Sequence, residues 1–280
     1  MKNIQNILVP IDFSITSRDA YRYAVQLAET LNAKLTVTHV IQNLVMVSDV
    51  MIAPFPLVDR IQIMRDLEQF IVEEGSTKNK IDIQILEGDV VDTLTELSKD
   101  KKTDLIVMGT TGLSDILTKL FGSVSTKLSN KAHCPVILVP RGAKWQPIEQ
   151  IMYASNYDSV TPQTIKEITD FAINIDADIH FVNVKSYDPV FEIKEKELDW
   201  KNLFTEINSN LYYETHTIYG NNTAEELEKY SESQNINLSA FVSKHRNFWE
   251  SLMHHSITEN AAISTTIPMM VIHLDEEIVS

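Results

Sequence analysis

Three of the seven glycines in the chain lie within one stretch of fourteen residues, at Gly109, Gly112 and Gly122. A glycine lets backbone N–H groups approach phosphate oxygens without a Cβ in the way, and it also permits positive φ. Ser123 and Val124 follow the third glycine where a helical apolar stripe begins, so open amides and the positive end of a helix dipole would face one point. The pattern G-x2-G-x9-G-S therefore favours a phosphate-binding loop. The alternative is an ordinary strand-to-helix connection whose glycines serve tight turns.

Two further residues are candidates for contacts to the rest of a nucleotide. Asp12 and Val40 each lie at or just past the end of an apolar strand, and ligands of open parallel sheets bind beyond the carboxyl ends of the strands. The Asp12 carboxylate could accept a hydrogen bond from a ribose hydroxyl or an adenine amine, and the Val40 backbone could read the adenine edge. Asp12 could instead be a turn or cap residue. Ser125 could bind phosphate or stabilise its own helix start, and Thr110 and Thr111 are interpreted as loop residues.

Strands and helices alternate through the first half of the chain. Apolar β-branched runs predict strands, and apolar residues at helical spacing predict the helices between them. The predicted strands are Ile7–Pro10, Leu35–Val40, Ile81–Leu86, Leu105–Met108 and Val136–Val139. Helices are predicted from the capping candidates Thr16 and Ser17 onward, and over about 58–74, 90–99 and 123–131. Strands separated by such helices imply right-handed βαβ units, and hence an α/β fold with a parallel sheet.

The same order of elements begins again after residue 141. A shift of 144 residues places residues 151–154 on 7–10, a shift of 132 places Gly220 on Gly88, and a shift of 133 places 268–271 on 135–138. Landmarks that coincide in this way indicate a duplication. The sequence therefore predicts two domains, residues 1–141 and 148–280, joined by a linker at Arg141–Pro147.

The second copy departs from the first where the chemistry would lie. Under these shifts Asp12 becomes Asn156, and Gly109, Gly112 and Gly122 become Val242, His245 and His255, while Ser123 becomes Ser256. Side chains would then fill the space that phosphates need. We expect the second copy not to bind a nucleotide in the same way.

With these motifs in place, the sequence resembles a tandem universal stress protein. The resemblance rests on the ILVPIDFS opening, the Gly88 break after the third strand, the three-glycine loop and the closing CPVILVP strand. It implies a five-stranded sheet ordered 3-2-1-4-5 in each half, with helices on both faces, and an ATP-binding first half. It also implies that Asp12, Val40, Gly109, Gly112, Gly122, Ser123 and, less directly, Val124 contact the nucleotide. The family's dimers pair through their fifth strands, so the two halves are expected to pair through Val136–Val139 and Met269–Ile272 as an intramolecular pseudo-dimer, with a further homodimer left open.

Charge and composition restrict the class of partner. The net charge is −15, which argues against general binding to nucleic acid or to an anionic membrane. Residues 1–141 hold 15 Lys+Arg against 17 Asp+Glu, and the rest of the chain holds 9 against 22. A polyphosphate would therefore be repelled far less by the first half. No stretch approaches the roughly 20 apolar residues that cross a bilayer, and a strand-like run follows Met1 at once, so we expect a cytoplasmic protein without membrane segments.

Several residues invite other interpretations. His245, His254 and His255 suggest a metal site, but adjacent helical residues point about 100° apart, and surface or packing roles are favoured. Cys134 is interpreted as a buried small apolar residue rather than a nucleophile. Residues Leu44–Leu57 could be a lid, a partner surface or local core packing.

These observations favour a regulatory or stress-response protein that binds ATP, or AMP or ADP, with Mg²⁺ possible alongside the nucleotide. No P-loop, nucleophile elbow or dinucleotide motif is present in the sequence, so a binding protein is expected rather than an enzyme. Two alternatives stay open at this point. One is slow hydrolysis of bound ATP, and the other is a nucleotide-independent module whose acidic second half binds an unknown protein partner.

Overall fold

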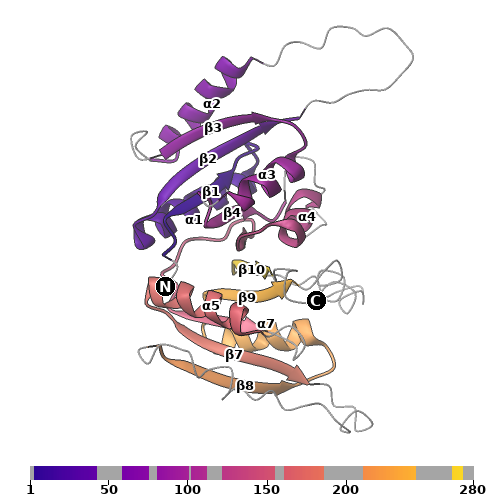
Figure 1. Cartoon of the computed structure of the whole chain (residues 1–280). Coiled ribbons are helices and arrows are strands. Elements are labelled where there is room, and N and C mark those ends of the chain that lie inside the picture. Colours follow the sequence, from indigo (N-terminus) through magenta and orange to yellow (C-terminus); the bar gives the residue numbers. More distant parts are fainter. Residues whose placement is uncertain are drawn as a thin grey trace, which may run out of the picture.

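The computed structural model describes residues 3–42, 59–75, 81–100, 102–111, 122–154, 161–185, 211–243 and 267–273. These residues form a single mostly parallel sheet of ten strands with helices on both faces, as Figure 1 shows. The α/β class predicted from the sequence is therefore confirmed. None of the described helices combines the length and apolar character that a membrane crossing needs.

The sheet has the order β3-β2-β1-β4-β5-β10-β9-β6-β7-β8. The first half supplies β1 (Asn6–Pro10), β2 (Lys34–Ile41), β3 (Ile81–Glu87), β4 (Leu105–Gly109) and β5 (Val136–Val139). The second half supplies β6 (Gln150–Ala154), β7 (Asp178–Lys185), β8 (Tyr213–Tyr219), β9 (Leu238–Ser243) and β10 (Met269–His273). The first five strands have the predicted order 3-2-1-4-5, and the second five repeat it in reverse across the sheet.

Helices from both halves cover each face of the sheet. On one face α1 (Ile15–Leu31), α2 (Arg60–Glu73) and α5 (Pro162–Ile175) contribute buried side chains to one apolar cluster. On the other face α3 (Val90–Lys99), α4 (Ser123–Lys131) and α7 (Thr223–Ser233) contribute to a second cluster. Each cluster contains residues from both halves, so the apolar core on each face is continuous along the sheet.

Equivalent hydrogen bonds in the two halves support the duplication. Asp104 Oδ2 accepts from the amides of Gln5 and Asn6, each at 3.0 Å. Asn237 Oδ1 accepts in the same way from Glu149 and Gln150, at 2.9 and 3.0 Å. The amide that follows the third strand also repeats its bond, since Gly88 N donates to Ile41 O and Gly220 N donates to Lys185 O. Positions related by the shifts of 144, 132 and 133 residues thus make equivalent hydrogen bonds in the two halves.

The two halves join through an antiparallel pair of strands, β5 and β10. Met269 lies opposite Leu138, Met270 opposite Ile137 and Val271 opposite Val136. The expected pairing of the fifth strands is present within the chain, and it gives each of these two strands a hydrogen-bonded neighbour on both sides.

The segment between the halves lies against α1. Gly142 N donates to Asp19 Oδ2 at 2.8 Å, and the Trp145 ring meets the Tyr23 ring edge to face with centroids 4.8 Å apart. Trp145 is half-buried and packs on the first apolar cluster. This part of the predicted linker therefore contributes to the core.

Helix α1 begins earlier than its capping candidates predict. Its N-cap is Ser14, whose side chain accepts from Ser17 N, so Thr16 and Ser17 lie inside the first turn. The shift arises because Phe13 takes a positive φ of 65° and Asp12 Oδ1 accepts from Ser14 N at 3.0 Å, which turns the chain directly after β1.

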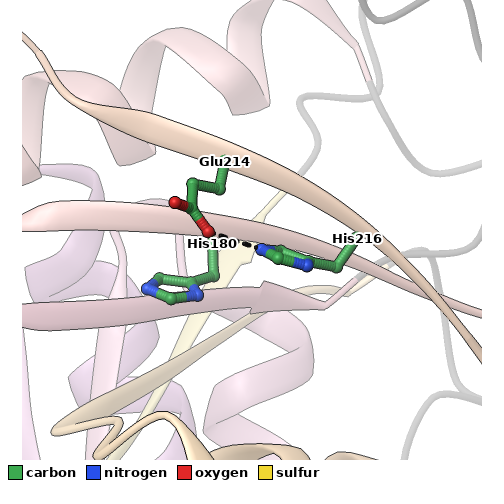
Figure 2. A group of neighbouring side chains, drawn as sticks. All are labelled: His180, Glu214 and His216. Carbon is green, nitrogen blue, oxygen red and sulfur yellow. Dashed lines mark hydrogen bonds and ion pairs between the residues drawn. The ribbon is translucent and has the colours of Figure 1, made fainter.

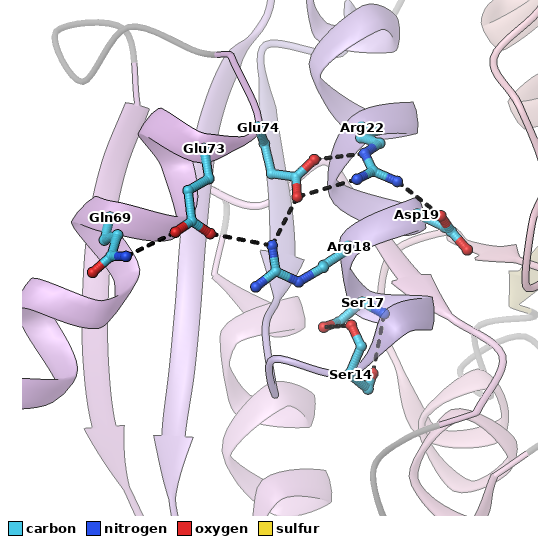
Figure 3. Close-up of polar contacts among 8 residues, drawn as sticks. All are labelled: Ser14, Ser17, Arg18, Asp19, Arg22, Gln69, Glu73 and Glu74. Carbon is cyan, nitrogen blue, oxygen red and sulfur yellow. Dashed lines mark hydrogen bonds and ion pairs between the residues drawn. The ribbon is translucent and has the colours of Figure 1, made fainter.

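The C-terminal end of α2 is held on α1 by a charged network (Figure 3). The Glu74 carboxylate, whose side chain is only 5% exposed, accepts from Arg18 at 2.9 Å and from Arg22 at 2.5 Å. Arg22 also reaches Asp19, and the Arg18 guanidinium stacks over Phe70 at 4.9 Å. These contacts attach the end of α2 to the first half of α1, the helix that follows β1.

Candidate functional site

The carboxyl ends of three neighbouring strands bring most of the described candidate residues to one edge of the sheet. β1 pairs in parallel with β2 on one side and with β4 on the other. The ends of these strands therefore place Asp12, Val40 and Gly109 side by side in the topology. Gly112 lies outside the described residues.

Asp12 lies in the tight turn between β1 and α1. Its Oδ1 accepts from Ser14 N, which is the turn role that the sequence left as an alternative. Ile11, just before it, still donates its amide to Thr38 O of β2 at 2.8 Å, and its carbonyl contacts His39 Nδ1 at 2.7 Å. The turn is thus tied to the neighbouring strand, and the half-buried Asp12 side chain is held in a defined place.

Val40 is half-buried near the end of β2, where it lies opposite Leu86 of β3. The next residue, Ile41, uses its carbonyl oxygen to accept from Gly88 N at 3.0 Å. The β2–β3 ladder therefore remains paired to the very end of β2, which fixes the position of the Val40 backbone.

A hydrogen bond to the main-chain carbonyl of Thr110 joins the two ends of the glycine-rich loop, which starts after β4 and ends at Gly122. Thr110 O accepts from Gly122 N and from Ser125 Oγ, both at 2.6 Å, while Thr110 N donates to Val139 O. The start of α4 is therefore held against the end of β4. Ser125 Oγ also contacts Gly122 O at 3.0 Å, so its hydroxyl supports its own helix start.

The start of α4 offers backbone donors. Helix α4 begins at Ser123 as predicted, and its N-cap Gly122 makes no side-chain capping bond. The first amides of an α-helix have no partner within the helix, so they carry the positive end of the helix dipole. At this end of the helix Ser123 is exposed and Val124 is half-buried, whereas Gly122 and Ser125 are buried.

Gly109 has a structural reason to be glycine. A Cβ built on it would lie 2.8 Å from both the carbonyl carbon and the carbonyl oxygen of Thr16. The Thr16 hydroxyl in turn donates to Thr111 O, so the first turn of α1 lies directly on the end of β4. The close approach of a helix to a strand accounts for this glycine without a ligand, and a contact of Gly109 with phosphate stays a prediction.

The second half places Val242 where the first half has Gly109. Val242 pairs with Ile272 in the β9–β10 ladder, as Gly109 pairs with Val139 in the β4–β5 ladder. Val242 is buried, so a branched side chain occupies this position. Asn156, His245, His255 and Ser256, the other residues aligned with the loop, lie outside the described residues, as do His254 and the segment Leu44–Leu57.

Sequence reasoning missed a cluster of polar side chains in the second half. His180 on β7 lies beside Glu214 and His216 on β8, with one possible ligand atom of each within 4.8 Å of the others (Figure 2). The only sign of this cluster in the sequence is the alternation of polar residues in the run from Tyr213 to Tyr219. That alternation does not show that β7 lies beside this run and contributes His180. Cys134 is buried, as the sequence predicted.

Comparisons with known proteins agree with this architecture. Residues 3–140 match the universal stress protein family. A universal stress protein of Methanocaldococcus jannaschii is 29% identical over 152 residues, which cover 50% of this chain and 84% of the relative. A stress response protein of Bacillus subtilis is 29% identical over 167 residues, covering 50% of this chain and 99% of the relative.

A solved structure of similar architecture extends the likeness to both halves. The crystal structure of a universal stress protein from Archaeoglobus fulgidus has a TM-score of 0.67 at 17% identity and covers 97% of each chain. At this identity the likeness concerns the fold. The sequence match over residues 3–140 shows that the first half of the chain is a domain of the universal stress protein family.

Proposed function

We propose that this protein binds one adenine nucleotide, ATP in the first instance, in its first half and acts as a regulatory protein of the stress response. The proposed site comprises Asp12 and Val40 at the ends of β1 and β2, Gly109 and Gly112 in the loop after β4, and Gly122, Ser123 and Val124 at the start of α4. The observation that carries the proposal is the start of α4, where Ser123 is exposed, the N-cap Gly122 makes no side-chain capping bond, and the Thr110 carbonyl holds the helix at the end of β4.

The chemistry of this helix start suits a polyphosphate. Amides without a partner donate well to phosphate oxygens, and each charge-assisted hydrogen bond of this kind contributes about 1.5–3 kcal/mol. The first half has nearly balanced charge, so an anionic ligand meets little repulsion there. Mg²⁺ would accompany the phosphates rather than require a protein-only cage.

The second half is proposed not to bind a nucleotide. Val242 is a buried branched residue at the position of Gly109, and the second half carries most of the negative charge. One site per chain follows from this difference. The division into domains 1–141 and 148–280 remains part of the same proposal.

The proposal can be tested by removing one backbone donor from the start of α4. Ser123 is the first residue of the helix, where proline is well tolerated, and Gly122 before it has φ −77° and ψ 164°, which a following proline accepts. Ser123→Pro should weaken ATP binding by about tenfold to a hundredfold, as expected for one charge-assisted bond, without loss of stability. Ser123→Ala keeps the amide and is the matched control, which should bind as the parent does.

Titration calorimetry with ATP, ADP and AMP, with and without Mg²⁺, gives the stoichiometry and the affinity. Asp12→Ala should weaken binding, whereas Asn156→Ala in the second half should not. Two sites per chain, no site, or equal binding by Ser123→Pro and Ser123→Ala would contradict the proposal. Release of inorganic phosphate that Asp12→Ala abolishes would favour the ATP hydrolysis alternative.

A further inference from the structure

Two neighbouring strands of the second half bring two imidazoles and one carboxylate together. His180 on β7 lies directly opposite Glu214 on β8, and His216 follows two residues later on β8. Residues two apart in a strand project from the same face, so Glu214 and His216 both lie on the side where His180 lies. Figure 2 shows the three side chains converging, and one possible ligand atom of each lies within 4.8 Å of the others.

The hydrogen bonds around His180 fix which ring nitrogen carries the proton. Gln150 donates its amide nitrogen to Asp178 Oδ2 at 3.2 Å, which directs its carbonyl oxygen to His180 Nε2 at 2.8 Å. A carbonyl oxygen can only accept, so Nε2 carries the proton and Nδ1 carries a lone pair. Metal-binding histidines are held in this way by an acceptor on the far ring nitrogen.

The Nδ1 lone pair faces a hydroxyl donor. Tyr230 Oη of α7 lies 2.8 Å from His180 Nδ1. Burial raises the pKa of Tyr230 to about 12, so the phenol keeps its proton and donates it to Nδ1 at neutral pH. A metal ion on Nδ1 would replace this single neutral hydrogen bond.

The other two side chains are placed to complete a site that is open to solvent. His216 Nε2 lies 2.8 Å from Glu214 Oε2, and the His216 and His180 rings are stacked with centroids 5.7 Å apart. The Glu214 and His216 side chains are 40% and 34% exposed, whereas His180 is buried. An ion can therefore enter from the surface, and the two exposed side chains can rotate toward it.

We propose that His180, Glu214 and His216 bind a divalent transition-metal ion, Zn²⁺ in the first instance. Two imidazoles and a carboxylate are ligands that zinc takes readily, and three protein ligands leave a fourth position for water or another molecule. With metal–ligand bonds of about 2.0–2.1 Å, tetrahedral ligand atoms lie about 3.3 Å apart. The His216 Nε2–Glu214 Oε2 distance of 2.8 Å and the largest separation of up to 4.8 Å lie on either side of this value, so rotation of the half-buried Glu214 and His216 side chains would be needed to reach it.

Burial, with His216 nearby as a second cause, lowers the pKa of His180, while the carboxylates of Glu214 and Asp178 oppose this shift. The direction of this shift favours the neutral imidazole, which is the form that a metal binds.

The first half has no such set at the equivalent positions. The shifts of 144 and 132 residues place Thr36 at the position of His180, Asp82 at that of Glu214 and Gln84 at that of His216. Thr36 lies opposite Asp82 in the β2–β3 ladder, as His180 lies opposite Glu214 in the β7–β8 ladder. The proposed site therefore belongs to the second half alone and is independent of the proposed nucleotide site.

The test is zinc binding by the full chain after treatment with a chelator, in the absence of nucleotide. Calorimetry with ZnCl₂ should show one ion per chain, and Co²⁺ should give the visible absorption of a four-coordinate site. His216→Ala and Glu214→Gln should each weaken zinc binding at least tenfold. Gln150→Leu, which removes the acceptor behind His180, should weaken it by about tenfold to a hundredfold.

Two controls make the outcome decisive. His133→Ala removes an exposed histidine of the first half and should leave zinc binding unchanged. Replacement of His245, His254 and His255 together by Gln should also leave it unchanged. The proposal is overturned if the parent does not bind zinc, if His216→Ala and Glu214→Gln bind as the parent does, or if the triple variant alone abolishes binding. Circular dichroism of each variant checks the fold, and the exposed positions of Glu214 and His216 favour its retention.

Discussion

At the residue scale, the packing of α1 on β4 requires glycine at position 109, and the proposed contact with phosphate would favour glycine there as well. The first turn of α1 occupies the space in which a side chain would lie, with the Thr16 backbone 2.8 Å from the place of a Cβ. The pattern of glycines predicted a loop with an open backbone, and α4 does begin at the residue that the pattern indicated. The pattern could not reveal that the first turn of α1 fills the space beside Gly109.

Gly109→Ala is expected to destabilise the protein whether or not a nucleotide is bound. Backbone atoms of Thr16 must move to admit the methyl group, and overpacking of this kind costs about 1–3 kcal/mol. Urea denaturation without ligand measures the loss. Gly220→Ala is the comparison: its Cβ would lie closer still to Glu226 Cγ, a side-chain atom that a change of rotamer can move, whereas the two Thr16 atoms nearest to Gly109 belong to the backbone. Similar losses in the two variants would contradict this explanation of Gly109.

The cluster of His180, Glu214 and His216 could not be predicted from the sequence. Glu214 and His216 are close in the sequence, but His180 is more than thirty residues away. Their meeting depends on the register between β7 and β8, in which His180 lies opposite Glu214. Alternation along a strand predicts which residues share a face, and it does not predict what the neighbouring strand places beside them.

At the element scale, the regular elements of the first half were predicted closely. Helices α3 and α4 and strand β5 have the predicted bounds, because each combines apolar periodicity with a clear start or stop. The start of α1 was predicted too late. The turn that begins it depends on a positive φ at Phe13 and on the Asp12 side chain, and apolar periodicity carries no signal of either.

The attachment of β1 next to β4 can be tested with the duplication as a guide. Asp104 is buried and accepts from two amides of the segment that begins β1, and the second half uses Asn237 for the same bonds. Asp104→Asn should therefore cost little, because an amide oxygen can accept both bonds. Asp104→Ala leaves two amides without this acceptor and should cost about 1–3 kcal/mol or more.

Thermal and urea unfolding of the two Asp104 variants measure this difference. Asn237→Asp provides the reciprocal exchange in the second half and should also be tolerated. Equal destabilisation by Asp104→Asn and Asp104→Ala would mean that the negative charge matters more than the shared hydrogen-bond geometry.

At the scale of the whole molecule, the sheet and both apolar clusters pass through the junction of the halves. Met270 is 1% exposed and lies opposite Ile137 in the β5–β10 pair. His273 Nε2 also contacts Ser129 O of α4 at 2.9 Å, so β10 touches a helix of the first half as well. The halves are thus coupled by backbone pairing, apolar packing and a side-chain contact.

Met270→Ala should lower the stability of both halves together, by about 2–5 kcal/mol for a large-to-small change in the core. Hydrogen exchange should become faster in β1 of the first half as well as in β6 of the second, because one cooperative unit spans the junction. Val72→Ala on the exposed face of α2, where Val72 is 56% exposed, is the control and should change little. Faster exchange confined to the second half would show that the halves unfold independently.

The β5–β10 junction also determines which halves can meet. Two separate copies that pair through this strand form a complex whose population falls on dilution, whereas a covalent connection keeps the local concentration of one half near the other on the order of millimolar or higher. Each half therefore always faces an unlike partner, and no like-with-like assembly is needed to complete the sheet. Because the two halves are separate stretches of one sequence, a substitution in one half does not appear in the other. The first half can therefore keep its glycine-rich loop while the second half acquires an imidazole–carboxylate cluster.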